Sequence, residues 1–238
     1  MGENRSIFNF KQFTLAHGNP GLKISTEACL FGAWASQFAT GKILDIGTGC
    51  GLLACMLAQS NPTSSFDAIE IHQEVARLAT ENIKNSPFVN QIQVIQSDIR
   101  SISARANYDF IISNPPFFSN HLPASSIDKQ IALHDDALSL ADLAIAIKSN
   151  IKPDGHFAVI YPKDVLDKFE KVLEENGLFV HHLVYIFPKF NSKILRVFCL
   201  GSTKIKEKSS EDFYIKDEKN QYTEAFKSML KPYYLIFE

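Results

Sequence analysis

The sequence has little of several features that mark specialised classes of protein. Its four cysteines, in 238 residues, form no CxxC pair, and no histidine cluster completes a zinc site. We therefore expect buried thiols in a reducing compartment and no bound metal. No apolar run approaches the roughly 18 residues of a membrane span, and the first residues lack a secretory apolar segment. These absences predict a cytoplasmic protein that makes no contact with membranes.

Net positive charge is also missing. The formal net charge is −2, whereas a nucleic-acid-binding protein usually carries a basic footprint. Basic residues nevertheless gather between positions 186 and 208, where six of them accompany one acid, Glu207. Such a run is commonly an ordinary solvated face, but it can also contact phosphate groups. Lys189, Lys193 and Arg196 are the candidates for that contact.

The composition is that of a globular α/β protein. Hydrophobic residues make up 45% and charged residues 21%, and 19 phenylalanines supply material for a core. A chain of this length can bury a sizeable core in one domain. We expect three parts within that domain: an N-terminal cap and helix (1–40), a Rossmann-like core (41–201) and a C-terminal extension (202–238).

Short apolar runs alternate with segments of helical periodicity along the core. This alternation predicts a doubly wound, mainly parallel sheet covered on both faces. Strands are expected at 42–46, 66–71, 91–96, 108–113 and 156–161, and helices at 27–39, 52–60, 73–85, 138–150 and 165–176. Lys152–Gly155 is expected to be the turn that closes the helix over 138–150.

The chain end carries two further predicted strands, at 178–187 and 195–201. The connection between them, 189–193, is too short for a crossover helix, so they should pair as an antiparallel hairpin and complete a seven-stranded sheet. Residues 1–24 are broken by glycine and proline, and residues 202–238 read as a charged linker with an aromatic end.

A glycine-rich segment, DIGTGCG, begins at Asp45, follows the first core strand and opens a helix. Gly47, Gly49 and Gly51 permit positive φ and let a ligand approach the backbone. Glu70 ends the second strand, where a carboxylate can accept hydrogen bonds from ribose hydroxyls. These positions share the carboxyl edge of the sheet, at the switch point where such folds bind ligands. The segment is therefore a candidate cofactor site.

The identity of the cofactor is more ambiguous, because Gly49–Ala54 also fits the dinucleotide pattern GxGxxA. Two features favour S-adenosylmethionine over NAD: the acid two residues before the first glycine, and the terminal hairpin in place of the second half of a dehydrogenase sheet. Asp98, after the third strand, could accept from the adenine amino group, and Ile71 and Ile99 could enclose the ring. The alternative for Asp98 is a helix cap or a loop acid, and the alternative for the two isoleucines is ordinary core packing.

The segment Asn114-Pro115-Pro116-Phe117 follows the fourth strand. The Asn114 side chain, which should also touch the cofactor, and the Pro115 carbonyl are acceptors that can hold both protons of a planar NH2 group. Its nitrogen lone pair then faces the methyl donor, and positioning replaces a strong base. Phe117 offers a stacking face worth ~1–3 kcal/mol to a base. A structural turn is the alternative interpretation.

These motifs together resemble class I methyltransferases that act on amino groups. More specifically, FKQF at 10–13, ISTEACLFGAWA at 24–35, NPPFF at 114–118 and LHDDALSLADL at 133–143 resemble the bacterial tRNA1(Val) adenine-37 N6-methyltransferase family, as does the terminal FKSMLKPYYLIF. The resemblance spans almost the whole chain. It implies transfer of a methyl group from S-adenosyl-L-methionine to N6 of an adenosine beside the anticodon of a tRNA. We expect the enzyme to be a monomer.

The resemblance also implies roles for individual residues. Those implied for the cofactor are Asp45, Gly47, Gly49, Gly51 and Glu70, with Thr26 near the methionine end, and those for the target base are Asn114 and Phe117, to which we add Phe118. Two departures are visible. The family's acid-x-acid reads Glu70-Ile71-His72 here, so a second acid is missing, and its Thr-Asp-Gly reads Thr26-Glu27-Ala28.

Three other functions fit parts of this pattern. An rRNA guanine-N2 methyltransferase also uses NPPF, but generally with a second, degenerate domain. A methyltransferase for the glutamine amide of a release factor more often has NPPY and a helical N-terminal domain. A catalytically silent S-adenosylmethionine-binding module would not need Asn114, which is intact together with the glycines.

Overall fold

The computed structural model describes residues 6–17, 23–102, 106–115 and 138–237. Its main sheet consists of β3 (Lys42–Ile46), β4 (Ser65–Glu70), β5 (Ile92–Gln96), β6 (Tyr108–Ser113), β7 (Ile151–Tyr161), β8 (Phe179–Lys189), β9 (Arg196–Ser202) and β10 (Ser209–Lys216). The helices are α1 (Thr26–Ala35), α2 (Leu52–Ser60), α3 (Gln73–Lys84), α5 (Leu140–Asn150), α6 (Lys163–Glu175) and α7 (Glu224–Leu230). The strand order is β10-β8-β9-β7-β6-β3-β4-β5.

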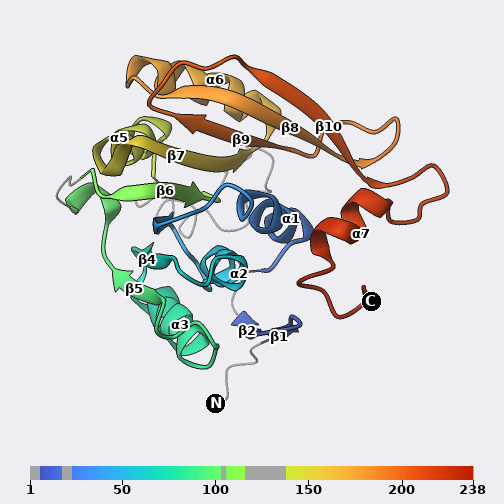
Figure 1. The fold of residues 1–238 in the computed structure, drawn as a ribbon, viewed down its shortest axis with the longest axis horizontal. Coiled ribbons are helices and arrows are strands. Elements are labelled where there is room, and N and C mark those ends of the chain that lie inside the picture. Colours follow the sequence, from blue (N-terminus) through green and yellow to red (C-terminus); the bar gives the residue numbers. More distant parts are fainter. Residues whose placement is uncertain (1–5, 18–22, 103–105, 116–137, 238) are drawn as a thin grey trace, which may run out of the picture.

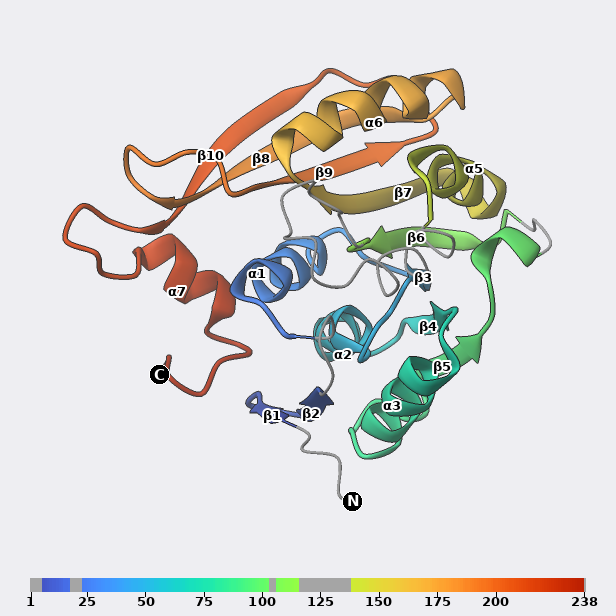
Figure 2. The same ribbon diagram turned by 180° about the vertical axis from the view of Figure 1, so that it is seen from behind.

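Two hydrophobic cores cover the two faces of this sheet. One joins α1, α2, α3 and α7 to alternate strand residues such as Ile43 and Phe110, and the other joins α5 and α6 to their neighbours Leu44 and Ile111. Figures 1 and 2 show α5 and α6 on one side of the sheet and α1, α2 and α7 on the other. Burial on both faces explains why the central strands are apolar almost without interruption.

The parallel strands β6, β3, β4 and β5 end at one edge. Ile46 of β3 lies opposite Ile69 of β4 and Ser113 of β6. The chain order reverses at β3, which has β4 on one side and β6 on the other. The residues that follow Ile46, Ile69 and Ser113 therefore meet at the switch point that the sequence predicted.

The predicted hairpin is confirmed: β8 and β9 are antiparallel, and Asn191 takes the positive φ of their turn. Because β9 is also antiparallel to β7, β8 runs in the same direction as β7 and β6. The carboxyl end of β8 thus lies on the same edge of the sheet as the carboxyl end of β6.

The region 202–238 is more ordered than the predicted linker. It contains β10, which pairs in parallel with the outer side of β8, so the sheet has eight strands and the prediction of seven was wrong. β10 (SSEDFYIK) is an edge strand whose apolar residues are confined to positions 213–215, so its sequence lacks the longer apolar run that marked the other strands. The chain then forms α7, whose Phe226 and Leu230 complete the core under α1.

Other boundaries also moved. Lys152–Gly155, the predicted turn, lies within β7, where the register with β6 jumps from Tyr108↔Ile151 to Phe110↔His156. The proline and glycine thus mark an irregularity in a strand rather than its beginning. The first helix stops at Ala35 instead of residue 39, and residues 36–38 form a turn.

The N-terminal residues were predicted to be irregular but form a small hairpin, β1 (Ser6–Asn9) with β2 (Thr14–His17). The tail holds it: the Lys11 amide donates to the Tyr233 carbonyl at 2.8 Å, and Phe10 bridges to Tyr234. Among the described residues, no helix is long and apolar enough to cross a membrane.

Candidate active site

The glycine loop joins β3 to α2 in the predicted position. Gly47, Gly49 and Gly51 have φ of 71°, 60° and 86°, a region that disfavours residues with a Cβ. A Cβ at Gly47 would meet no atom within 4 Å, so this part of the loop faces open space. The amides of Gly47 and Thr48 both donate to the Ile69 carbonyl at 2.9 Å, which fixes the loop against β4. The loop is therefore rigid and approachable.

Asp45 lies beneath this loop rather than on its open side. The residue is fully buried, and its Oδ2 accepts from the Thr48 hydroxyl at 2.6 Å. Burial raises the pKa of Asp45 to about 7, and the negative charge of Glu70 adds to the shift. Its visible contact is with the loop, so it is placed to shape the site.

Glu70 connects the glycine loop with the end of β4. Its Oε2 accepts from the Gly49 amide at 3.1 Å, and its Oε1 accepts from the His72 amide at 3.1 Å. Only 6% of the residue is exposed. Each carboxylate oxygen can accept a second hydrogen bond. The group can therefore hold the loop and accept from a ligand hydroxyl simultaneously.

Asp98 has two engaged oxygens. It caps the short 3-10 helix Ile99–Ser101 by accepting from the Arg100 amide at 2.9 Å, and the Arg100 guanidinium lies 2.7 Å from Oδ2. Arg100 accordingly lowers the pKa of Asp98. Ile71 follows β4 and is half-buried, and Ile99 begins the 3-10 helix and is buried. The structure places all three at the predicted edge, with Asp98 in the capping role considered for it.

Asn114 and Pro115 follow β6 and therefore flank the glycine loop. The Ser113 hydroxyl donates to the Ile46 carbonyl at 2.8 Å, which ties the two strand ends together. Asn114 is half-buried and Pro115 buried. Pro116, Phe117 and Phe118, together with the predicted loop 119–131, lie outside the described residues.

Thr26 is the exposed first residue of α1, and Ser25, not Thr26, is the cap: its Oγ accepts from the Ala28 amide at 3.2 Å. Thr26 lines a hollow of about 460 Å³ together with Lys189 and Ser192. The hollow lies beyond the carboxyl ends of β8 and β10, on the same edge as Asn114.

The basic run separates into two groups in space. At the turn end of the hairpin, Lys189 and Lys193 are exposed, and Arg196 lies 3.8 Å from Glu27. At the other end of β9, Lys204 pairs with Asp154, Lys206 contacts His156 at 2.9 Å and Lys208 pairs with Glu170 at 2.5 Å. The first group consists of the three candidates for phosphate contact, and the second has local acceptors.

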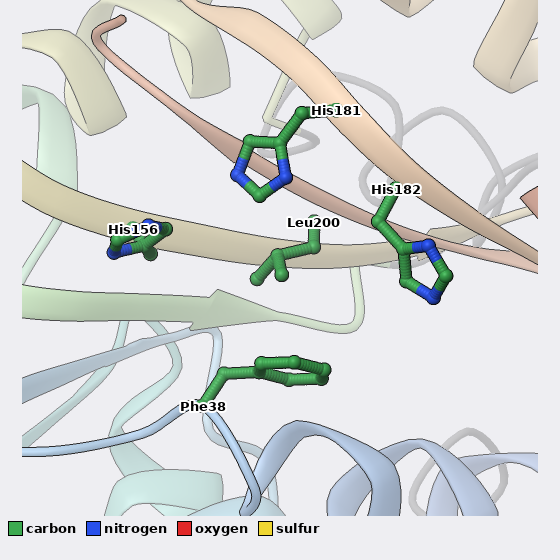
Figure 3. Close-up of a pocket in the computed structure, with 5 residues that line it drawn as sticks. All are labelled: Phe38, His156, His181, His182 and Leu200. Atoms are coloured by element: carbon green, nitrogen blue, oxygen red, sulfur yellow. The ribbon is translucent and has the colours of Figure 1, made fainter. Parts of the chain in front are cut away.

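A second hollow, of about 410 Å³, was not foreseen (Figure 3). Its lining residues are Phe38, His156, His181, His182 and Leu200. Burial and the nearby Lys206 charge lower the pKa of His181 to about 4 and lower that of His156. His156 on β7 and His181 on β8 come together because both strands pair with β9, so only the adjacent pair His181-His182 was apparent from the sequence. Within the described ranges, no cluster of His, Cys, Asp or Glu could hold a metal.

The fold and the glycine loop define a class I S-adenosylmethionine-dependent methyltransferase. Residues 26–141 match the methyltransferase small domain family. A structure described as a predicted O-methyltransferase from Agrobacterium tumefaciens superposes with a TM-score of 0.62 and 15% identity, covering 86% of this chain and 95% of that one. A TehB-like SAM-dependent methyltransferase from Corynebacterium glutamicum superposes with a TM-score of 0.50 and 18% identity. The superposition covers 76% of this chain and 89% of that one.

Sequence relatives narrow the class to one family. The tRNA1(Val) (adenine(37)-N6)-methyltransferase of Parabacteroides distasonis is 35% identical over 231 residues, which is 96% of this chain and 97% of the relative. The enzyme of the same name from Pseudoalteromonas translucida is 36% identical over 233 residues, which is 97% of this chain and 99% of the relative. The chain belongs to the tRNA1(Val) (adenine(37)-N6)-methyltransferase family.

Proposed function

We propose that the protein transfers a methyl group from S-adenosyl-L-methionine to N6 of adenosine 37 in tRNA1(Val). The observation that carries the proposal is the juxtaposition of Asn114 with the glycine loop, fixed by the Ser113 to Ile46 hydrogen bond. It puts acceptors for an amino group beside a backbone that a cofactor can approach. The names of the full-length relatives support the choice of substrate.

The residues at this edge fit the proposed cofactor. The open space at Gly47 admits a ligand against the backbone, and Glu70 can accept from ribose hydroxyls. Asp98 would exchange part of its contact with Arg100 for the adenine amino group. Ile71 and Ile99 are the proposed contacts of the adenine, and Thr26 is the proposed contact at the methionine end. Gly49, Gly51 and Asn114 would contact the cofactor at the glycine loop. Asp45 would act on the site through Thr48. When bound, the cofactor supplies an electrophilic methyl group.

The protein's own contribution to the chemistry is positioning. The Asn114 side-chain oxygen and the Pro115 carbonyl accept hydrogen bonds from the two N–H groups of the target amine, which directs the nitrogen lone pair away from them. One of these two protons is lost to water as the new N–C bond forms. Phe117 and Phe118 provide aromatic faces for the adenine ring. Since the nitrogen is a weak nucleophile, holding it at attack distance is the main source of acceleration.

The anticodon loop is the part of the tRNA that suits this site. A base must leave its stack to reach a pocket of this kind, and the cost is lower in a single-stranded loop than in a duplex. The proposal includes a monomer that acts in the cytoplasm, with Lys189, Lys193 and Arg196 contacting the RNA backbone.

Methylation of a defined transcript tests the proposal. An unmodified tRNA1(Val) transcript would be incubated with the protein and labelled S-adenosyl-L-methionine, then digested and analysed by mass spectrometry. We expect N6-methyladenosine at position 37 and none when adenosine 37 is replaced by guanosine. N2-methylguanosine in either transcript, or cofactor binding without methylation of any tRNA, would overturn the assignment.

A further inference from the structure

Two lysines occupy directly opposite positions on the last strands of the sheet. Lys216 at the end of β10 pairs in register with Lys189 at the end of β8. Opposite residues of neighbouring strands lie on the same face of a sheet, and like charges in such positions repel each other. Both lysines line the 460 Å³ hollow at the carboxyl edge. The pair therefore concentrates positive charge in the hollow.

The acids of the described residues do not neutralise this positive charge. Among the described residues, neither Lys189 nor Lys216 forms a salt bridge, whereas Lys204 and Lys208 on the same stretch of chain each have an acid. The acid that lines the hollow, Glu27, faces Arg196 at 3.8 Å. An external anion between the two lysines would therefore relieve repulsion that the fold leaves in place.

The hollow is also held in shape by local hydrogen bonds. The Ser192 hydroxyl donates to the Lys189 carbonyl at 2.6 Å, which fixes the hairpin turn. On the other side, the Asp217 amide donates to the Gln221 carbonyl at 2.8 Å and closes the turn after β10. Both lysines consequently extend from fixed backbone positions, which reduces the entropy lost on binding.

An aromatic ring stands next to the cations. Tyr222 lines the hollow with 37% of its surface exposed, and the Lys216 ammonium lies 5.5 Å from the ring centre. Its ring stacks on buried Phe226 with centres 4.8 Å apart and planes 17° from parallel. A flat supported ring beside two cations is the combination that binds the bases and phosphates of single-stranded nucleic acid.

The position suits a contact some nucleotides from the target base. Register pairs put Ser113 of β6, Val159 of β7, Cys199 of β9 and Leu183 of β8 at the same level of the sheet. Lys189 follows Leu183 along β8, so it extends past the level at which β6 ends. Strand rise and spacing put the hollow roughly 20 Å from Asn114. An RNA strand with its target base at Asn114 can reach that distance along the same edge.

We propose, resting on the proposed function, that this hollow binds a phosphate of the tRNA strand a few nucleotides from the target adenosine. Lys189 and Lys216 hold the phosphate, and Tyr222 contacts the adjoining sugar or base. The strand β10 and the turn 217–223, which the sequence presented as a linker, thus become part of the substrate site.

The test is the affinity of an unmodified tRNA1(Val) transcript for the double variant Lys189→Ala/Lys216→Ala, measured across salt concentrations. Each single-strand phosphate contact contributes about 0.7 to the slope of log affinity against log salt. Because the two lysines hold one phosphate, the double variant should lose about 0.7 from this slope and bind about fourfold more weakly at 0.15 M salt. The KM for tRNA should rise while kcat and cofactor affinity remain unchanged.

The matched control is Lys168→Ala/Lys171→Ala, which removes the same charge from exposed positions of α6. Thermal unfolding checks that all variants fold. A Tyr222→Ala variant should weaken tRNA binding without changing the salt slope. If the Lys189/Lys216 variant has the affinity and slope of the α6 control while the wild type methylates the transcript, the hollow is not an RNA site and the proposed function stands. If the wild type methylates no tRNA, both proposals fail.

Discussion

Glu70 fastens the glycine loop to the end of the neighbouring strand by accepting the Gly49 amide and the His72 amide, each at 3.1 Å. The carboxylate is the predicted acceptor for ribose hydroxyls, and it also holds the loop of the proposed cofactor site. Replacing it should therefore affect the cofactor twice, through a lost ligand contact and through a loosened loop.

Glu70→Ala should weaken the binding of S-adenosyl-L-methionine by ~1–3 kcal/mol, the cost of leaving buried polar groups without a partner. Titration calorimetry measures the change, and wild-type protein should give no comparable heat with NAD. Glu74→Ala is the control, because this acid is exposed on α3 and forms an ion pair with Arg77. Equal affinities of the Glu70 variant and the wild type would remove Glu70 from the cofactor site.

Asn114→Ala should separate catalysis from folding. The change removes a side-chain acceptor that orients the target amine, so turnover should fall by a factor on the order of 100 or more. Thermal stability should stay close to that of the wild type, and cofactor affinity should change far less than turnover, because Asn114 is only one of several proposed cofactor contacts. Asn114→Asp, which keeps acceptor oxygens in the same place, should retain more activity than the alanine variant. Wild-type turnover by Asn114→Ala would reduce NPPFF to a structural turn.

Phe117→Leu tests the stacking role. Leucine keeps apolar bulk but lacks a flat face, so use of the RNA substrate should decline by up to the ~1–3 kcal/mol of a base stacked on an aromatic ring. Steady-state kinetics with the transcript would show the loss, and calorimetry should show unchanged cofactor affinity. A Phe117→Tyr variant preserves the ring and should behave like the wild type. Loss of cofactor binding in the leucine variant would contradict this assignment.

The divided basic run gives a matched pair of triple variants. Methionine at Lys189, Lys193 and Arg196 should weaken tRNA binding and flatten its salt dependence, because these side chains lie at the carboxyl edge. Methionine at Lys204, Lys206 and Lys208 should leave the salt dependence unchanged. In the folded protein these ammonium groups already contact an acid or a histidine. Filter binding across salt concentrations compares the two. Identical slopes would make the whole run a solvated surface.

Asp45 predicts a pH dependence of stability. Its folded pKa, raised to about 7 by burial, exceeds the ordinary value of 3.8, so the folded protein binds this proton more tightly than the unfolded chain. The stability from this group is full below about pH 4 and is lost as the pH rises to about 7. Asp45→Asn should therefore gain in stability relative to the wild type between pH 5 and pH 8. Urea unfolding at both values measures this, and an equal difference at both would contradict the raised pKa.

Much of the fold could be predicted from local patterns. The run KILDI followed by DIGTGCG located β3 and its loop, and periodicity located α2, α3 and α6 within two residues. The short connection at 189–193 correctly predicted an antiparallel hairpin. These features depend on neighbouring residues: glycine conformations, apolar spacing and loop length each act over a few positions.

β10 and the β1–β2 hairpin required the tertiary structure. Serine and charged residues fill most of SSEDFYIK, and its strand conformation depends on hydrogen bonds to β8, more than 20 positions away in the sequence. Likewise the hairpin at residues 6–17 is held by the Tyr233 and Tyr234 backbone at the other end of the chain. Local propensity cannot express such pairings, because the stabilising partner is distant in sequence.

The same division applies to the candidate site. Local patterns were enough to identify the available groups, with Glu70, Asn114 and the glycines at strand ends whose shared edge follows from parallel topology. Three relationships depended on the folded structure: Asp45 lies under the loop, Asp98 is engaged by Arg100, and Lys189 stands opposite Lys216. Chemistry resides in the residue types, but contact and repulsion depend on distance, and distances between remote residues exist only once the sheet has formed.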